Sequence, residues 1–247
     1  MATRKEIHDR VLNATCKEEL ATVYGEWAEQ YDKDLIDEMG YVAPAIASQL
    51  LQGYAENQHI RILDAGCGTG LVGEDLHQNG YLNLEGFDYS VKMLERAKDK
   101  GVYTRLHQGD LTGRLDLPEN SYDAIISVGT FTCGHVGPEA FDELIRITKP
   151  GGHICFTVRD QAWEEDNYRL AFPGATLFYF IHRQAVIILF PSLVTNRKAE
   201  MTSRLGNADQ FIKSLRADMA AGKCSDTDDR IVTVFRQLKS AGQVPLM

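Results

Sequence analysis

The sequence has few of the features that mark nucleic-acid-binding or secreted proteins. Its 247 residues include 26 lysines and arginines against 35 aspartates and glutamates, a net charge of −9, with no basic stripe interleaved with aromatics. Because neutralisation of phosphates supplies much of the affinity for nucleic acid, we expect no nucleic-acid partner. The first residues, 1–5, lead into polar sequence rather than an apolar segment, so we expect no secretory signal.

Cysteine pairs and metal-ligand motifs are also missing. The five cysteines show no paired spacing, and the chain has no H-E-x-x-H, C-x-x-C or P-loop lysine motif. We therefore expect no metal and a reducing compartment, namely the cytoplasm, with the nucleus as the alternative. No internal repeat or low-complexity tract occurs. With 44% apolar residues over this length, the chain can bury a sizeable core.

The most informative stretch is a glycine-rich loop after a short apolar strand. The string ILDAGCGTG at 62–70 indicates a buried strand that ends near Asp64 and turns through three glycines into a helix. Glycines let the backbone approach a ligand, and the N–H groups of the helix start point toward it. A dinucleotide-dependent oxidoreductase needs glycine where Leu71 stands, and Asp64 would repel a pyrophosphate. A carboxylate there suits a ligand with an ammonium and a sulfonium. A tight turn without a ligand is the alternative.

A second carboxylate follows the next predicted strand. The string LEGFD at 84–88 ends at Asp88, about 20 residues beyond the loop, where an acidic side chain holds a ribose diol. Ser90 is a plausible N-cap for the helix that follows. Met93 lies one turn into that helix, where a soft side chain could pack on an adenine face. An ordinary core methionine is the alternative.

The order of the predicted elements indicates a doubly wound α/β sheet, mostly parallel and Rossmann-like. A third strand at 103–107 leads to Asp110, and a fourth at 122–129 is almost continuously apolar, as expected of a parallel strand covered on both faces. The string KPGG at 149–152 is predicted to break the chain before a fifth strand at 153–158. Ligands bind beyond the carboxyl ends of such strands. Asp110 could there accept from the adenine amine, although a turn residue is the alternative.

These motifs resemble those of class I S-adenosyl-L-methionine (SAM)-dependent methyltransferases, and within that superfamily the methyltransferase-like 27 family. The resemblance covers residues 20–170. The strings that carry it are VYGEWAEQYD at 23–32, ILDAGCGTGLVG at 62–73, GFDYSVKMLERA at 86–97, YDAIISVGTF at 122–131 and TKPGGHICFTVR at 148–159.

The resemblance implies the activity, the cofactor and the residues that contact it. A methyl group would pass from SAM to an acceptor by in-line displacement, with the cofactor supplying the reactivity. Two aromatic residues of an N-terminal helix would cover the cofactor, and the glycine loop and strand ends would hold it. The residues expected at the cofactor site are Trp27, Tyr31, Asp64, Gly66, Cys67, Gly68, Gly70, Asp88, Tyr89, Met93, Asp110, Leu111, Val128, Gly129 and Phe131.

The N-terminal residues 1–56 are predicted to form a helical cap on a core at 57–171. Four-residue spacing places Val23, Trp27 and Tyr31 on one face of a helix over 21–31, and a second helix is expected over 42–54. In related enzymes such helices form a lid that gates turnover. A stripe that merely faces the core is the alternative for these residues.

No motif specifies the methyl acceptor, which we expect to be a small molecule or a protein. The string SVGT at 127–130 differs from the D/N-P-P-Y of amide and adenine N-methylases, and no Pro-Cys pair of the pyrimidine type occurs. His135, just past the fourth strand, is the one candidate catalytic base, since histidine takes a proton at neutral pH. A hydrogen bond to the loop backbone is the alternative role.

The last part of the chain, 172–247, departs from the family pattern and is expected to be an atypical extension. Apolar runs at 175–181 and 185–190 flank a polar triplet and favour a final β-hairpin. A membrane span is the competing interpretation, but Arg183 near its centre would cost roughly 2.5–3.5 kcal/mol, so we expect no membrane. Beyond the runs only weak helical patterns follow. A non-catalytic regulator that binds SAM or S-adenosylhomocysteine is therefore the alternative function.

Overall fold

The structure is a computed structural model, and it describes residues 4–14, 16–55, 57–132, 136–159, 162, 176–179 and 185–191. The helices are α1 (Arg4–Asn13), α2 (Lys17–Trp27), α3 (Tyr31–Lys33), the π-helical turn η1 (Asp34–Glu38), α4 (Ala43–Gln52), α5 (Leu71–Gln78), α6 (Val91–Lys100) and α7 (Ala140–Ile147). The strands are β1 (Ile62–Ala65), β2 (Leu84–Asp88), β3 (Arg105–Gln108), β4 (Tyr122–Phe131), β5 (Thr148–Arg159), β6 (Thr176–Tyr179) and β7 (Ala185–Pro191).

All seven strands belong to one sheet, in the order β3-β2-β1-β4-β5-β7-β6. β1 to β5 are parallel, β7 runs antiparallel to β5, and β6 runs antiparallel to β7. The predicted doubly wound, mostly parallel α/β fold is confirmed. The two apolar runs of the expected extension supply β6 and β7, so these residues share a sheet with the core. Within the described residues, no helix is long and apolar enough to cross a membrane.

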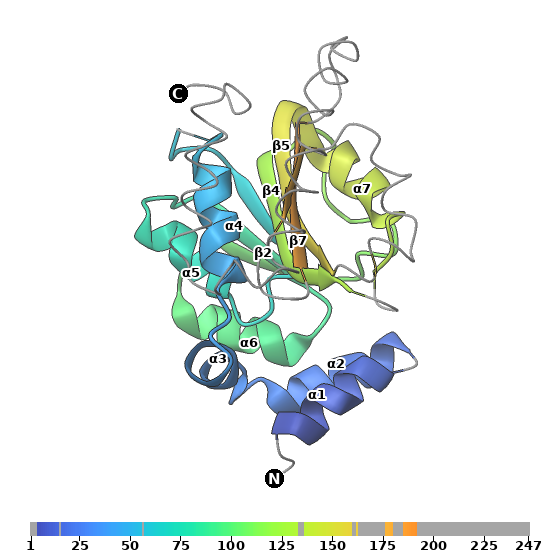
Figure 1. Cartoon of the computed structure of the whole chain (residues 1–247). Helices are drawn as coiled ribbons and strands as arrows, with labels where there is room; N and C mark the ends of the chain where they lie inside the picture. The colour runs from blue at the N-terminus through green and yellow to red at the C-terminus, as the bar shows by residue number, and fades with distance from the viewer. Residues whose placement is uncertain are drawn as a thin grey trace, which may run out of the picture.

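Helices cover both faces of the sheet because neighbouring strand residues point to opposite sides. On one face, Ile126 of β4 packs in a cluster with Leu51 of α4 and Leu76 of α5. On the other face, Ile125 packs in a cluster with Leu144 of α7. Figure 1 shows α4 and α5 on one side of the sheet, α7 on the other, and α1 and α2 across one end. The sheet therefore forms the centre of a three-layer core.

Helix α6 begins where the sequence predicts an N-cap. The hydroxyl of Ser90 accepts a hydrogen bond from the amide of Met93 at 3.4 Å, which confirms the predicted N-cap. The helix stops at Gly101, whose φ of +67° is the left-handed conformation that glycine adopts freely. The N-cap fixes the turn that follows β2, and this turn carries the candidate ribose ligand.

The predicted break at 149–152 is wrong, because β5 begins at Thr148 instead of His153. Tyr122 of β4 pairs with Thr148 while Ala124 pairs with His153, so the extra residues of β5 form a bulge. Gly151 has a φ of +80° in this bulge. A bulge tolerates proline inside a strand because the missing N–H needs no partner there. Pro150 therefore does not end the strand pairing.

The predicted helix over 21–31 is divided in two. α2 ends at Trp27, where the amide of Gln30 bonds the Trp27 carbonyl at 2.9 Å, and α3 begins at Tyr31. The indole N–H of Trp27 donates to Asp34 at 2.7 Å, and Thr69 donates to Asp32 at 2.5 Å. These bonds hold the segment after α2 against the glycine loop. The N-terminal helices thereby acquire a fixed position over one end of the sheet.

Candidate active site

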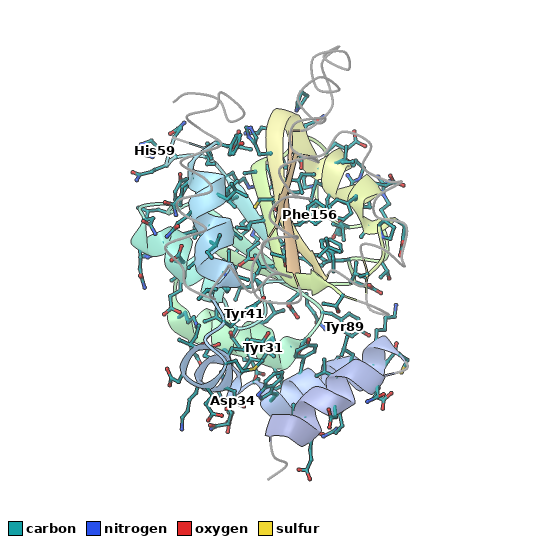
Figure 2. All side chains as sticks on the ribbon, in the orientation of Figure 1. Tyr31, Asp34, Tyr41, His59, Tyr89 and Phe156 are labelled. Atoms are coloured by element: carbon teal, nitrogen blue, oxygen red, sulfur yellow. The ribbon has the colours of Figure 1, made fainter. Side chains whose placement is uncertain are left out.

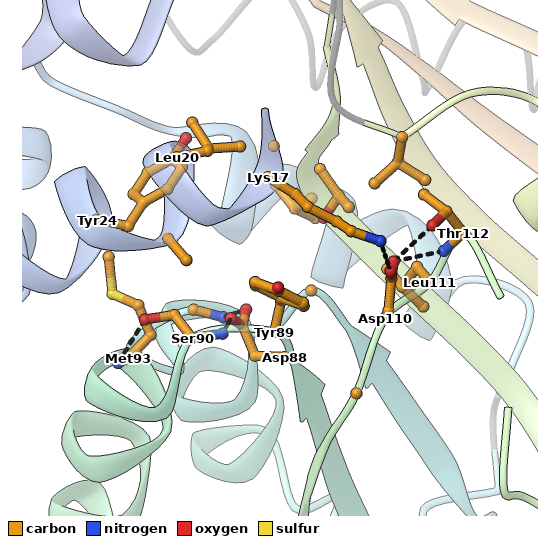
Figure 3. A pocket seen from close by; sticks show the side chains of 18 of the residues that line it. Lys17, Leu20, Tyr24, Asp88, Tyr89, Ser90, Met93, Asp110, Leu111 and Thr112 are labelled. Carbon is orange, nitrogen blue, oxygen red and sulfur yellow. Dashed lines mark hydrogen bonds and ion pairs between the residues drawn. The ribbon is translucent and has the colours of Figure 1, made fainter. Parts of the chain in front are cut away.

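A cavity of about 880 Å³, counting the solvent at its mouth, lies at the carboxyl ends of β1 to β4 beneath α2. Its walls come from the glycine loop, the turns after β2 and β3, the end of β4 and one face of α2 (Figure 3). The sheet order reverses between β1 and β4, and ligands of open α/β sheets bind at such a switch point.

Asp88 is held at the floor of this cavity by the backbone. Its Oδ2 accepts from the amide of Gly68 at 2.8 Å, and its Oδ1 accepts from the amide of Ser90 at 2.8 Å. Burial raises the pKa of Asp88, while these amide bonds act in the opposite direction. Each carboxylate oxygen keeps a second lone pair, so the carboxylate can still accept from two neighbouring hydroxyls.

Asp110 stands on the opposite wall, where β3 ends. Its Oδ1 accepts from the Thr112 amide at 2.9 Å and from the Thr112 hydroxyl at 2.7 Å, while its Oδ2 pairs with Lys17 of α2 (Figure 3). Burial alone would raise the pKa of Asp110, but the bonds from Lys17 and Thr112 outweigh it and hold this pKa below its usual value. The carboxylate is therefore ionised and faces the cavity.

Asp64 lies deeper, at the end of β1, with only 2% of its surface exposed. Its Oδ2 accepts from the hydroxyl of Tyr103 at 2.5 Å, whereas its Oδ1 has no hydrogen-bond partner among the described residues. Burial raises the pKa of Asp64 to about 7, with a smaller contribution from the nearby charge of Asp88. A buried acceptor without a donor is costly unless a ligand supplies one.

Helix α2 supplies one wall of the cavity through a single helical face. Leu20, Ala21 and Tyr24 line the cavity, and the ring of Tyr24 meets that of Tyr31 edge-on at 6.1 Å. Burial raises the pKa of Tyr31 well above its usual value, so its hydroxyl stays protonated. Figure 2 shows Tyr31 near the end of the sheet that α1 and α2 cross.

Ten of the expected cofactor contacts stand on the cavity wall. They come from the N-terminal cap, the glycine loop and the three strand ends that follow it. They are Tyr31, Gly66, Gly68, Asp88, Tyr89, Met93, Asp110, Leu111, Val128 and Gly129. The topology thus brings together residues that are far apart in the sequence. The candidate base His135 lies outside the residues that the structure describes.

The other five expected contacts, Trp27, Asp64, Cys67, Gly70 and Phe131, are not among the residues that line the cavity. Trp27 is 3% exposed, and its N–H is taken by Asp34. Phe131 is fully buried, with its ring 4.6 Å from that of Phe141. Both aromatic side chains pack in the hydrophobic core. A large aromatic ring is more stable when buried there than when it is exposed to solvent in the cavity.

The sequence interpretation missed the α2 face that lines the cavity. Lys17, Leu20, Ala21 and Tyr24 recur at the helical spacing of three and four residues, which was a usable signal. The predicted stripe is Val23, Trp27 and Tyr31; Val23 and Trp27 pack in a core cluster with α1, whereas Tyr31 lines the cavity. Periodicity does not show which of the two faces of this helix lines the cavity.

Comparison with known proteins identifies the type of domain. Residues 63–156 match the family model of a methyltransferase domain. Methyltransferase-like protein 27 of Homo sapiens is 42% identical over 139 residues, covering 55% of this chain and 56% of that protein. The malonyl-(acyl-carrier protein) O-methyltransferase of Pectobacterium atrosepticum is 31% identical over 157 residues, covering 60% and 59%. The chain thus spans less than two thirds of the length of these curated relatives.

A solved structure shares the fold. The TehB-like SAM-dependent methyltransferase of Corynebacterium glutamicum superposes with a TM-score of 0.52 at 18% identity, covering 69% of this chain and 99% of that one. In sequence, fold and cavity position, residues 63–156 therefore resemble a class I methyltransferase domain. In sequence this domain is close to Methyltransferase-like protein 27. The predicted resemblance is confirmed.

Proposed function

We propose that the chain is a SAM-dependent methyltransferase that binds its cofactor in the cavity under α2. The observation that carries the proposal is the set of carboxylates at three consecutive strand ends: Asp64, Asp88 and Asp110. Asp88 would accept from the two ribose hydroxyls, and Asp110 from the adenine amine. Asp64 offers an unpartnered buried oxygen beside the glycine loop, which fits a ligand that carries an ammonium.

The residues of the chain would bind and orient, since the bound cofactor supplies a methyl carbon already activated by its sulfonium. Met93 and Leu111 would enclose the adenine, and Tyr31 would cover the ligand from the cap. The apolar part of the wall would exclude water from the bound methyl carbon and help to align the acceptor with it. His135 remains our candidate base for acceptors that must lose a proton, and the 1–56 cap our candidate lid.

We propose a small molecule or a protein as acceptor, in the cytoplasm. The second relative is named for methylation of a malonyl-(acyl-carrier protein), which illustrates an acceptor of this kind. Cys67 and Cys155 are free and buried thiols, which supports a reducing compartment. A non-catalytic binder is the rival function. Transfer of labelled methyl groups from SAM to any component of a cell extract would eliminate it.

The cofactor site is tested by titration calorimetry with SAM and S-adenosylhomocysteine. We expect micromolar binding by the wild-type chain and a loss of at least about tenfold, about 1.4 kcal/mol, in Asp88→Ala. The matched control is Asp99→Ala, which removes a carboxylate from the exposed end of α6 and should leave affinity unchanged. Equal affinities of wild type and Asp88→Ala would remove the ribose assignment, and a folded wild type that binds neither compound would refute the proposed function.

A further inference from the structure

Tyr103 occupies space that two glycines of the loop and the following helix leave open. A Cβ on Gly73 would lie 2.3 Å from the Tyr103 hydroxyl oxygen, and a Cβ on Gly70 would lie 3.0 Å from its ring. Gly73 has ordinary helical φ, so its lack of a side chain is explained by this ring alone. Gly70 is the third glycine of the motif and is not among the cavity-lining residues. Gly70 also has a φ of +92°, which favours glycine whatever the space, so Gly73 is the glycine that the tyrosine ring alone accounts for.

The ring reaches through this space to the carboxylate at the end of β1. The hydroxyl of Tyr103 donates to Asp64 Oδ2 at 2.5 Å, while Asp64 Oδ1 accepts nothing from the described residues. Asp64 is buried, and its other ionisable neighbours are the thiol of Cys67 and the carboxyl of Asp88. Tyr103 is thus the one described side chain that donates to this carboxylate.

We propose that Tyr103 is a positioning residue, which holds Asp64 by one oxygen so that the other can accept from the ammonium of the cofactor. This inference rests on the proposed function, because it assumes that the cavity binds SAM. Tyr103, like Asp64, is not among the residues that line the cavity, but Asp64 stands two positions before the cavity-lining Gly66. The effect of Tyr103 on binding passes through the orientation and the charge of Asp64.

The proposed role has a consequence for pH dependence. Burial favours the neutral form of Asp64, as does the nearby charge of Asp88, whereas the hydrogen bond from Tyr103 and, to a smaller extent, the backbone amide of Gly73 favour the ionised form. An ammonium binds the ionised form only, so affinity should rise with pH as Asp64 loses its proton, up to the pH at which the ligand amine loses its own proton. Without the tyrosine hydroxyl, the pKa of Asp64 rises further, and the acid limb of the binding profile moves to higher pH.

The test compares Tyr103→Phe with wild type in the binding of S-adenosylhomocysteine between about pH 6 and pH 9. We expect the acid midpoint to shift upward by about one pH unit, with up to about tenfold weaker binding near pH 7. Methylthioadenosine, which lacks the amino-acid end, should bind both proteins within about twofold of each other. A merely structural loss would weaken both ligands and would not move the midpoint.

The matched control is Tyr81→Phe. Tyr81 is a buried tyrosine whose hydroxyl donates to the Ala55 carbonyl at 2.5 Å and whose side chain does not line the cavity. We expect no shift of the midpoint in this variant. Asp64→Asn provides a second test that keeps the tyrosine, and it should abolish the acid limb for S-adenosylhomocysteine.

The outcomes separate this inference from the proposed function. Binding by wild type with an unshifted midpoint in Tyr103→Phe, or an acid limb that persists in Asp64→Asn, overturns the role of Tyr103 alone. Equal losses for the two ligands in Tyr103→Phe overturn it as well. Failure of the wild-type chain to bind S-adenosylhomocysteine at any pH overturns the proposed function, and with it this inference.

Discussion

Gly66 shows at the scale of one residue why the motif requires glycine. Its φ is +77°, and a Cβ at this position would lie 2.1 Å from the Thr130 hydroxyl oxygen. Its amide donates to the Phe87 carbonyl at 2.7 Å, so the backbone cannot move away without breaking this bond. Both the dihedral angle and the space around the residue therefore exclude a side chain, and the residue lines the cavity.

We predict that Gly66→Ala destabilises the fold by more than about 2 kcal/mol, because left-handed strain adds to the clash with Thr130. Gly101→Ala is the matched control. Gly101 has a similar φ of +67°, but a Cβ at this position would have no neighbouring atom within 4 Å, so a loss of about 1 kcal/mol is expected. Urea denaturation of the two variants gives the comparison. Equal losses of unfolding free energy in the two variants would show that the Thr130 side chain moves aside without destabilising the fold.

At the scale of one element, α2 is fastened at both ends. At its last residue, the indole N–H of Trp27 donates to Asp34 at 2.7 Å in the buried part of the cap. At its first turn, Lys17 pairs with Asp110 across the cavity, with both side chains partly exposed. An exposed ion pair is weak, so the first turn is the end that a ligand can displace. Asp110 is also the residue that we expect to bind the adenine amine.

We predict that Lys17→Gln strengthens SAM binding at low salt by up to about fivefold, because the lysine no longer competes with the ligand amine for the same carboxylate oxygen. Wild-type affinity should approach that of the variant as salt screens the pair. Lys149→Gln is the control, since Lys149 pairs with Asp123 at 2.8 Å with similar exposure at the start of β5. Calorimetric titration of each protein with SAM at two salt concentrations measures the effect. Weaker binding by Lys17→Gln than by wild type would show that the lysine contributes to SAM binding.

For the molecule as a whole, Glu143 joins the segment before β4 to α7. Its carboxylate accepts from the guanidinium of Arg146 at 2.6 Å and from the amide of Leu115 at 2.8 Å. The hydrogen bond from Arg146 lowers the pKa of Glu143 to about 2, with further contributions from Leu115 and nearby arginines. The unfolded chain has a value of about 4.3, so the folded state binds this proton less readily.

We predict a pH dependence of stability from this site. A carboxyl with a lowered pKa contributes stability that is present above about pH 4.3 and lost as the pH falls through about 2. Glu143→Gln should therefore be about 1 kcal/mol less stable than wild type at neutral pH, with the difference shrinking toward pH 2. Thermal unfolding across this range measures it. Glu95→Gln, which removes an exposed pair with Lys92, should show no such trend.

The sequence by itself determined the parallel sheet and most of the residues that line the cavity. Strand ends, glycines and carboxylates are local signals, because a buried strand, a tight turn and an N-cap each follow from a few neighbouring residues. The positions of Asp88, Ser90 and Met93 follow from the turn after β2 alone. Ten of the expected contacts therefore line the cavity.

Only the tertiary structure decided which residues stand behind that wall. Trp27 and Phe131 are aromatic residues near the motifs, and both are buried in the core. Trp27 donates a hydrogen bond to Asp34, and Phe131 stacks on Phe141. Lys17 lies 93 positions from Asp110, a pairing that no local pattern reveals. The same holds for Tyr103 and Asp64, since the space between them is set by glycines on two other elements. Contacts between distant segments depend on how the layers pack, and sequence periodicity carries no information about that.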